Sequence, residues 1–272
     1  MNFSKSRVKI EPLERLAGDV TTQLKDKNTV VLVFFVWAGG NILHPALQKF
    51  VAALKKNKPN VLAMGVSLPG RISLAGQPYT DFQQLVPAVV SSLEEFNARC
   101  HPQIKFIYVG YSLGSLLATQ VLAKMGLAFQ KDRMLLFVAA ACKTIFDDFE
   151  EQSKVHNMSE AELVKYMVEK GGTPKELLAS KDMRAMILPP IRSDYALLAS
   201  VCRVDRAKLK EFLSCSLLVL YSDDYALSEV ESWRSIAAAD SCVNLSFVEG
   251  GHFFLMSNPS LVAELVCRYS SK

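Results

Sequence analysis

Short apolar, β-branched runs alternate with longer amphipathic stretches along most of the chain. An α/β fold is therefore expected, with a mostly parallel central sheet flanked by helices, because strands that alternate with helices build β-α-β units. Apolar runs of this length predict strands that are buried on both faces. The predicted strands cover 29–36, 61–68, 104–109, 134–140, 216–221 and 243–248, and the predicted helices cover 44–54, 81–98, 113–124, 229–239 and 261–269.

The alternation breaks between residues 143 and 201. This stretch contains no convincing strand, only helical patterns interrupted by Gly171-Gly172-Thr173-Pro174 and by Pro189-Pro190. We interpret 143–201 as a helical lid inserted into a core made of 1–142 and 202–272. The segment before residue 29 carries no motif that indicates a function.

Composition favours one folded domain with an insertion. The chain has 272 residues, of which 50% are hydrophobic and 21% charged, which argues against disorder. The net charge of +4 is too small to indicate a nucleic-acid partner. No signal core and no apolar run long enough to span a membrane is present, so a cytoplasmic protein without a membrane partner is expected. The six cysteines show no C-x-x-C spacing, which predicts buried free thiols and no metal site.

The segment Gly110-Tyr111-Ser112-Leu113-Gly114 has the G-x-S-x-G pattern between a predicted strand and a predicted helix. In this context the serine sits on a cramped turn, and small residues are required on both sides of it. The helix that follows directs its first N–H groups toward developing negative charge. We therefore predict that Ser112 is a nucleophile, and that the fold is that of the α/β hydrolases.

A serine nucleophile needs a base, which is most often a histidine oriented by a carboxylate. The α/β-hydrolase order of serine, acid and histidine selects His252, in the loop after the last predicted strand, and leaves His44, His101 and His156 with structural roles. The acid is then Asp223 or Asp224, which directly follow the preceding strand.

An oxyanion hole needs two backbone donors. One is the N–H of Leu113, which follows the nucleophile, and the other comes from a loop after an early strand. The segment Trp37-Ala38-Gly39-Gly40 closes the first strong strand, so we assign the second donor to Ala38. No nucleotide-binding glycine pattern is present.

Nearly the whole chain resembles the type II thioesterases, the stand-alone editing hydrolases of polyketide and nonribosomal peptide synthesis. Segment 35–40 (FVWAGG) resembles the family's F-P-H-A-G-G, and 68–71 (LPGR) matches its L-P-G-R. Segments 171–174 (GGTP) and 188–195 (LPPIRSDY) are similar to lid motifs of the family, and 250–255 (GGHFFL) matches G-G-H-F-F-L. Trp37, Tyr111 and Leu113 depart from the family's usual His, His and Met.

The resemblance implies a Ser112–Asp224–His252 triad that hydrolyses acyl thioesters carried by phosphopantetheine. It selects Asp224 over Asp223 because Asp224 occupies the family's acid position ahead of Trp233. It also implies an acyl or peptidyl carrier protein as partner and no cofactor other than the arm on the substrate. The chain is expected to be a monomer. Trp37, Tyr111 and Met186 are expected to contact the acyl group.

Three alternatives stay open at this stage. The chain could be a carboxylesterase or acyl-CoA hydrolase, or a transferase that passes the acyl group to another nucleophile. It could also be a carrier-binding protein that no longer turns over. The apolar positions of the insertion fit an acyl pocket and a helix-packing core equally well.

Overall fold

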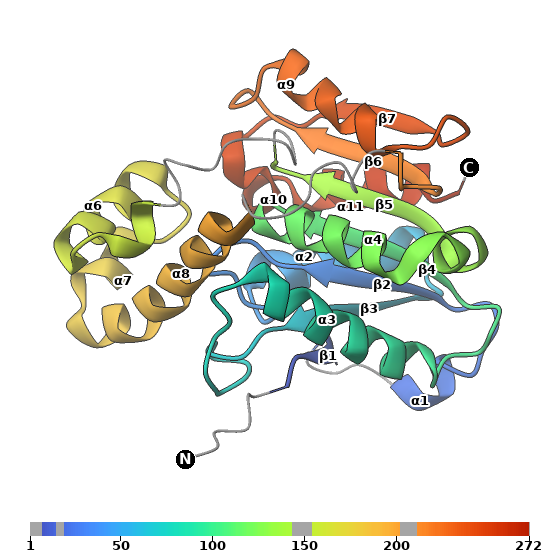
Figure 1. Ribbon diagram of the computed structural model, residues 1–272, viewed down its shortest axis with the longest axis horizontal. Coiled ribbons are helices and arrows are strands. Elements are labelled where there is room, and N and C mark those ends of the chain that lie inside the picture. The colour runs from blue at the N-terminus through green and yellow to red at the C-terminus, as the bar shows by residue number, and fades with distance from the viewer. Residues whose placement is uncertain (1–6, 15–18, 143–153, 202–210, 272) are drawn as a thin grey trace.

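A computed structural model describes residues 7–14, 19–142, 154–201 and 211–271. A seven-stranded sheet crosses the molecule in the order β1-β3-β2-β4-β5-β6-β7 (Figure 1). β1 is antiparallel to β3, and every other neighbouring pair is parallel. The strands are β1 (Lys9–Pro12), β2 (Val30–Phe35), β3 (Val61–Ser67), β4 (Lys105–Tyr111), β5 (Met134–Ala140), β6 (Ser216–Tyr221) and β7 (Val243–Phe247).

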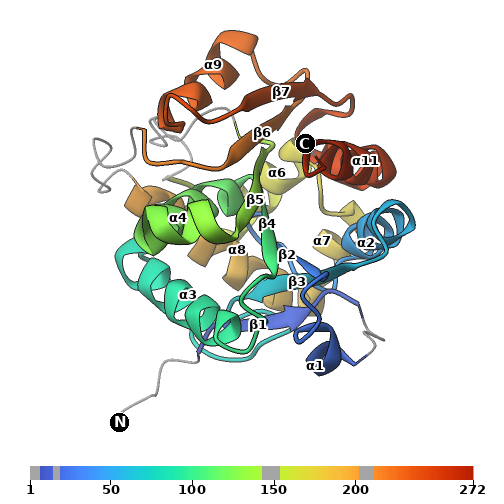
Figure 2. The ribbon, with the colours of Figure 1, turned by 90° about the vertical axis from the view of Figure 1, so that its right-hand side faces the viewer.

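Helices cover both faces of this sheet (Figure 2). Helices α3 (Phe82–Asn97) and α4 (Leu113–Arg133) lie on one face, while α2 (Pro45–Asn57) and α11 (Pro259–Tyr269) lie on the other. The double cover explains why all residues of β2 and β3 are buried. The other helical elements are α1 (Val20–Gln23), α6 (Glu160–Lys170), α7 (Lys175–Ala179), α8 (Lys181–Val201), α9 (Leu227–Glu231), α10 (Phe254–Ser257) and the short helices η1 (Val155–Asn157), η3 (Ser232–Ile236) and η4 (Gly251–Phe253).

The predicted α/β fold is confirmed, and β2 to β7 lie where the apolar runs place them. The edge strand β1 was not predicted, because its four residues include a lysine, a glutamate and a proline. The helix predicted over 113–124 continues to Arg133, across a kink at Gly126, whose φ of 82° is not helical. The helix predicted over 229–239 is α9 followed by the 3₁₀ helix η3.

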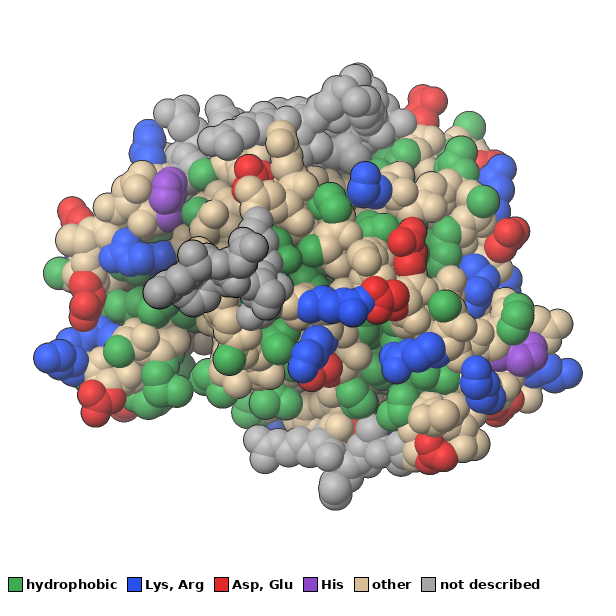
Figure 3. Space-filling view, turned by 60° about the horizontal axis from the view of Figure 1, so that its bottom comes forward, with side chains coloured by type: hydrophobic (Ala, Val, Ile, Leu, Met, Phe, Trp, Pro, Cys, Tyr) green, Lys and Arg blue, Asp and Glu red, His purple; other side chains and the backbone are tan. Residues whose placement is uncertain are grey.

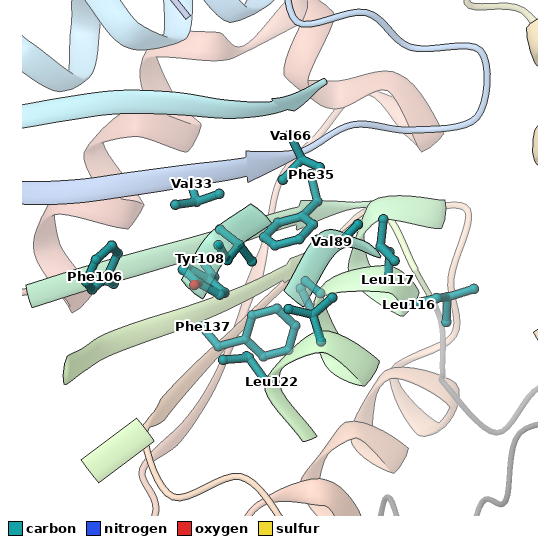
Figure 4. Close-up of a cluster of buried hydrophobic side chains, with 14 of the residues drawn as sticks. Val33, Phe35, Val66, Val89, Phe106, Tyr108, Leu116, Leu117, Leu122 and Phe137 are labelled. Carbon is teal, nitrogen blue, oxygen red and sulfur yellow. The ribbon is translucent and has the colours of Figure 1, made fainter. Parts of the chain in front are cut away.

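The larger core fills the space between the sheet and helices α3 and α4. Figure 4 shows aromatic side chains of β2, β4 and β5 beside aliphatic side chains of these two helices. Phe35, Tyr108 and Phe137 are each exposed by at most 1%. This packing fixes the first turns of α4 against the carboxyl ends of the central strands, which is the edge where open parallel sheets place their sites.

Residues 154–201 are helical and project from one end of the sheet (Figure 1). They have their own apolar cluster, which contains Leu163, Met167, Leu178 and Leu188. Ser159 and Glu162 form a reciprocal capping box at the start of α6. Residues 143–153 and 202–210 lie outside the described residues, so the predicted domain boundaries stay a prediction.

A buried ion pair joins this helical segment to the core. Asp194 of α8 lies 2.7 Å from a guanidinium nitrogen of Arg71, and both side chains are at most 5% exposed. Arg71 also donates to the carbonyl of Gly40 at 2.8 Å, and the N–H of Gly39 donates to Asp194 at 2.6 Å. The loop after β2 is therefore attached directly to α8.

Charged side chains of both signs mix with apolar ones on the face drawn in Figure 3. Among the described cysteines, Cys100, Cys142 and Cys215 are buried as predicted, whereas Cys242 is exposed and Cys267 is half-buried. Cys202 lies outside the described residues. Across the described part of the chain, no helix combines the length and the hydropathy needed for a membrane span.

Replacing one member of the buried pair is expected to destabilise the protein strongly. Asp194→Leu leaves the Arg71 guanidinium buried without a counter-charge, so the free energy of unfolding should fall by about 3–5 kcal/mol in urea titrations. Adding Arg71→Met should recover part of the loss, because an apolar pair carries no unbalanced charge.

The exposed pair between Glu264 and Arg268 provides a control, since both side chains are more than half exposed. Glu264→Gln should change the free energy of unfolding by less than about 0.5 kcal/mol. Equal losses for Asp194→Leu and Glu264→Gln would contradict the role given to the buried pair.

Candidate active site

Ser112 lies on the turn between β4 and α4 in a conformation that residues with side chains rarely adopt. Its φ is 55° and its ψ is −120°, and its N–H donates to the carbonyl of Ala140 in β5 at 2.8 Å. Such backbone strain persists only where the surroundings enforce it. The structure thus has the tight strand-turn-helix geometry that the G-x-S-x-G pattern predicts.

Two glycines make this turn possible. A Cβ on Gly110 would lie 2.5 Å from the Cα of Ser115, and a Cβ on Gly114 would overlap the carbonyl oxygen of Phe35 at the end of β2. Ser115 adds a polar tie, because its hydroxyl donates to the carbonyl of Ala140 at 3.0 Å. The start of α4 is therefore pressed against β2 and β5.

The two predicted oxyanion donors lie on the elements that this close approach brings together, α4 and the loop after β2. Leu113 is the first residue of α4, and Ala38 is three residues beyond the end of β2. Among the described residues, no hydrogen bond engages the backbone N–H of either one. Both are available to a developing oxyanion, and their pairing stays a prediction.

The loop carrying His252 is tied to the residue before the nucleophile. The hydroxyl of Tyr111 donates to the backbone carbonyl of His252 at 2.6 Å and accepts the N–H of Leu255 at 3.3 Å. The Tyr111 and His252 rings meet edge to face, with centroids 6.3 Å apart. The structure therefore brings the loop of His252 to the turn of Ser112.

The two predicted acids follow β6 and hold the backbone of the same loop. The carboxylate of Asp224 accepts the N–H of His252, and Oδ1 of Asp223 accepts the N–H of Gly251 at 3.3 Å. The ring nitrogen Nδ1 of His252 instead lies 2.5 Å from the hydroxyl of Tyr225. Sequence reasoning did not single out Tyr225, because a tyrosine that follows two aspartates in a loop carries no motif.

Burial lowers the pKa of His252 to about 4, although the carboxylate of Asp224 opposes this shift. Lys170, at the end of α6, adds a smaller effect in the same direction as burial. The imidazole is therefore neutral at pH 7, which is the state that can accept a proton from a serine hydroxyl.

Three residues were expected to contact the acyl group. Tyr111 is 1% exposed and Trp37 is 8% exposed, and the two rings pack against each other with centroids 5.7 Å apart. Both rings are buried, and the Tyr111 hydroxyl holds the histidine loop. Their contact with the acyl group stays a prediction. Met186 is 51% exposed on α8, and its contact with substrate stays a prediction.

The helical segment approaches both loops of the site. A Cβ on Gly39 would lie 2.5 Å from Cγ1 of Ile191 in α8, and a Cβ on Gly172 would overlap the ring of Phe253. The Phe253 ring is itself 4.9 Å from that of His252. The segment therefore lies against the loop of Ala38 and the loop of His252, which is the position expected of a lid.

His44 and His101 have local structural roles. Nδ1 of His44 accepts the N–H of Ala46 at the start of α2, and Nδ1 of His101 accepts the N–H of Gln103. Nδ1 of His156 is buried without a hydrogen bond among the described residues. No cluster of three or more potential metal ligands occurs in the described part of the chain.

Comparisons with known proteins identify the family of this chain. Residues 31–269 match the family model of the thioesterase domain. The medium-chain S-acyl fatty acid synthase thioesterase of Homo sapiens is 26% identical over 247 residues, which are 88% of this chain and 87% of the human protein.

Two solved structures share the fold. The type II thioesterase YbtT of the yersiniabactin NRPS/PKS pathway has a TM-score of 0.73 at 18% identity, covering 96% of this chain and 98% of its own. The type II thioesterase BorB of the borrelidin biosynthetic cluster has a TM-score of 0.72 at 20% identity, covering 96% and 97%. Because the family model spans most of the chain, this protein belongs to the thioesterase family.

Proposed function

We propose that this thioesterase hydrolyses acyl thioesters presented on the phosphopantetheine arm of a carrier protein. Ser112 is the nucleophile, His252 the general base and Asp224 the carboxylate that accompanies the histidine. The observation that carries the proposal is the strained conformation of Ser112 beside a loop that holds a neutral histidine. A neutral base beside a half-buried serine on a tight turn is what acyl transfer requires.

The reaction runs in two halves. His252 takes the proton of the Ser112 hydroxyl while Oγ attacks the thioester carbonyl, and the proton then passes to the departing pantetheine thiol. An acyl-serine remains. His252 next takes a proton from water, which attacks the acyl-serine and releases a free acid while the proton returns to Oγ of Ser112.

Backbone N–H groups stabilise both tetrahedral intermediates in this proposal. Leu113 and Ala38 supply them, and the positive end of α4 adds to their effect. A thiol is a good leaving group because its pKa is near 8.5, so little proton donation is required. The steps use only protein groups and water, and they call for no metal or organic cofactor.

The proposed partner is an acyl or peptidyl carrier protein. The relatives' names support this choice, since they place thioesterases at a fatty acid synthase and in NRPS/PKS pathways. Those assemblies hold acyl groups as thioesters on carriers. Removal of stalled acyl groups and release of a finished product are both compatible with the proposed chemistry.

Ser112→Ala should abolish hydrolysis, because it removes the atom that receives the acyl group. We expect kcat to fall by at least about 10⁴-fold with an acyl-loaded carrier protein, followed as free acid by mass spectrometry. Ser228→Ala, at an exposed position of α9, is the control and should retain wild-type activity. Undiminished turnover by Ser112→Ala would exclude Ser112 as the nucleophile.

A substrate panel separates the rival functions. The carrier-bound thioester should be cleaved with a higher kcat/KM than the matching acyl-CoA or a p-nitrophenyl ester. A preference for the free ester or the CoA would indicate a carboxylesterase or acyl-CoA hydrolase. Failure of Ser112 to react with a fluorophosphonate probe, while carrier binding persists, would indicate a binding protein.

The pH dependence of kcat/KM should follow the lowered pKa of His252. Only the neutral imidazole accepts the serine proton, so activity should be level from pH 6 to 8 and fall only below about pH 5. Lys170→Met removes a nearby positive charge and should move this acidic limb to higher pH. Brief assays started from a pH 7 stock measure both profiles.

Removing a negative charge near His252 should shift the acidic limb in the opposite direction from removing a positive one. Asp224→Asn removes the charge that raises the pKa of His252, so the acidic limb should move to lower pH. An acidic limb centred at the ordinary histidine value of about 6.5 in the unmodified protein would contradict the burial of the base.

A further inference from the structure

The orientation of the His252 ring depends on a phenol in the described structure. Nδ1 lies 2.5 Å from the hydroxyl oxygen of Tyr225, and the two ring centroids are 6.3 Å apart. Asp224 and Asp223 accept backbone N–H groups of the same loop. Among the described residues, no carboxylate hydrogen-bonds to the imidazole.

A second contact of Tyr225 decides which atom donates in this pair. Its hydroxyl also lies 2.9 Å from the backbone carbonyl of Ala141, and a carbonyl can only accept. The single hydroxyl hydrogen is therefore directed to Ala141, and a lone pair of the same oxygen faces Nδ1. The hydrogen bond to the ring is then satisfied only when Nδ1 carries the proton.

The Ala141 carbonyl is itself held firmly. Ala141 follows β5 with a φ of 52°, and its N–H donates to the carbonyl of Leu220 in β6 at 3.0 Å. The preceding residue, Ala140, accepts the N–H of Ser112. The end of β5 thus positions both the nucleophile's backbone and the acceptor for Tyr225, and positive φ at a non-glycine residue is typical of such functional positions.

Burial keeps both partners neutral. It raises the pKa of the Tyr225 hydroxyl, so the phenol does not ionise near pH 7, and Cys142, Tyr111, Asp224 and Glu229 act in the same direction. Burial also lowers the pKa of His252, as described above. A neutral imidazole carries one proton, and which nitrogen holds it is set by the partner of the other.

We propose that Tyr225 is a positioning residue that accepts the Nδ1–H of His252 and thereby leaves Nε2 unprotonated to act as the base. Asp224 then acts on the loop through the backbone N–H and through its charge. This inference rests on the proposed function of Ser112 and His252. During acyl transfer Nε2 gains the serine proton and Nδ1 keeps its own, so no proton passes to Tyr225.

Tyr225→Phe tests the proposal by removing one hydroxyl. We expect kcat to fall by about 10- to 100-fold while KM changes by less than about twofold, because a positioning residue acts on the base and not on substrate binding. Tyr221→Phe is the matched control. Tyr221 lies at the end of β6, its ring packs on Phe247, and its hydroxyl forms no hydrogen bond among the described residues. That variant should keep wild-type kcat and KM.

Nitrogen NMR of the imidazole gives a readout that a merely structural role would not change. With ¹⁵N-labelled histidine, the resting protein should show His252 protonated on Nδ1, whereas Tyr225→Phe should show protonation on Nε2. A His252→Gln variant assigns the signals, since the chain has only four histidines. Thermal melting of each variant verifies that it is folded.

Two results would overturn the proposal. One is Tyr225→Phe with wild-type kcat and an unchanged tautomer. The other is a switch of tautomer in Asp224→Asn but not in Tyr225→Phe, which would make the carboxylate the ring's partner. The NMR measurement does not depend on turnover, so it stays informative if Ser112 proves not to be the nucleophile.

Discussion

The turn from β4 into α4 brings the backbones of three strands into contact. The N–H of Ser112 donates to Ala140 at the end of β5, and Gly114 lies against the carbonyl of Phe35 at the end of β2. Because no room exists for a larger residue at 110 or 114, the turn has one conformation, in which Ser112 adopts a positive φ. The positions of the Ala38 loop and of the Ala141 carbonyl both follow from this contact.

Tyrosine hydroxyls extend this constraint to the histidine. Tyr111 precedes the nucleophile and donates to the carbonyl of His252, while Tyr225 bridges Ala141 and the imidazole. Each hydroxyl contacts two polar partners, which an apolar side chain could not do. The histidine is thus positioned from β4 and β5, the strands that position Ser112.

The helical segment closes around the same elements. Its α8 is joined to the Gly39 loop through Asp194 and Arg71, and its Gly172 turn meets Phe253 beside the histidine. A displacement of the segment would therefore change the contacts of both the Gly39 loop and the His252 loop. This arrangement links the position of the proposed lid to the geometry of the proposed chemistry.

The apolar pattern of the sequence predicts the central strands and the nucleophile turn, but it misses elements that lack that pattern. Strands β2 to β6 are mainly apolar runs, and the glycines at 110 and 114 stand at the spacing that the G-x-S-x-G pattern requires around Ser112. The expected burial of β7 on both faces is wrong, because this edge strand alternates apolar and polar residues and is only partly buried. β1 lies at the sheet edge, where exposure removes the apolar pattern.

Contacts between distant segments were beyond sequence reasoning. Tyr225 meets Ala141 and His252 only because β5, β6 and β7 end at one edge of the sheet. The burial of the Tyr111 ring and its hydroxyl contact with the histidine loop also follow from the fold and not from the motif. Which of two neighbouring aspartates serves the histidine is a question of loop geometry that spacing does not answer.

The most direct test of the central claim is to trap the acyl-enzyme. The protein is mixed with an acyl-loaded carrier, quenched in acid within milliseconds to seconds, and analysed by intact-mass and peptide mass spectrometry. The account predicts a mass increase equal to the acyl group, located on the peptide that contains Ser112. Release of free acid with an adduct on another residue, or with no covalent adduct at any time point, would contradict it.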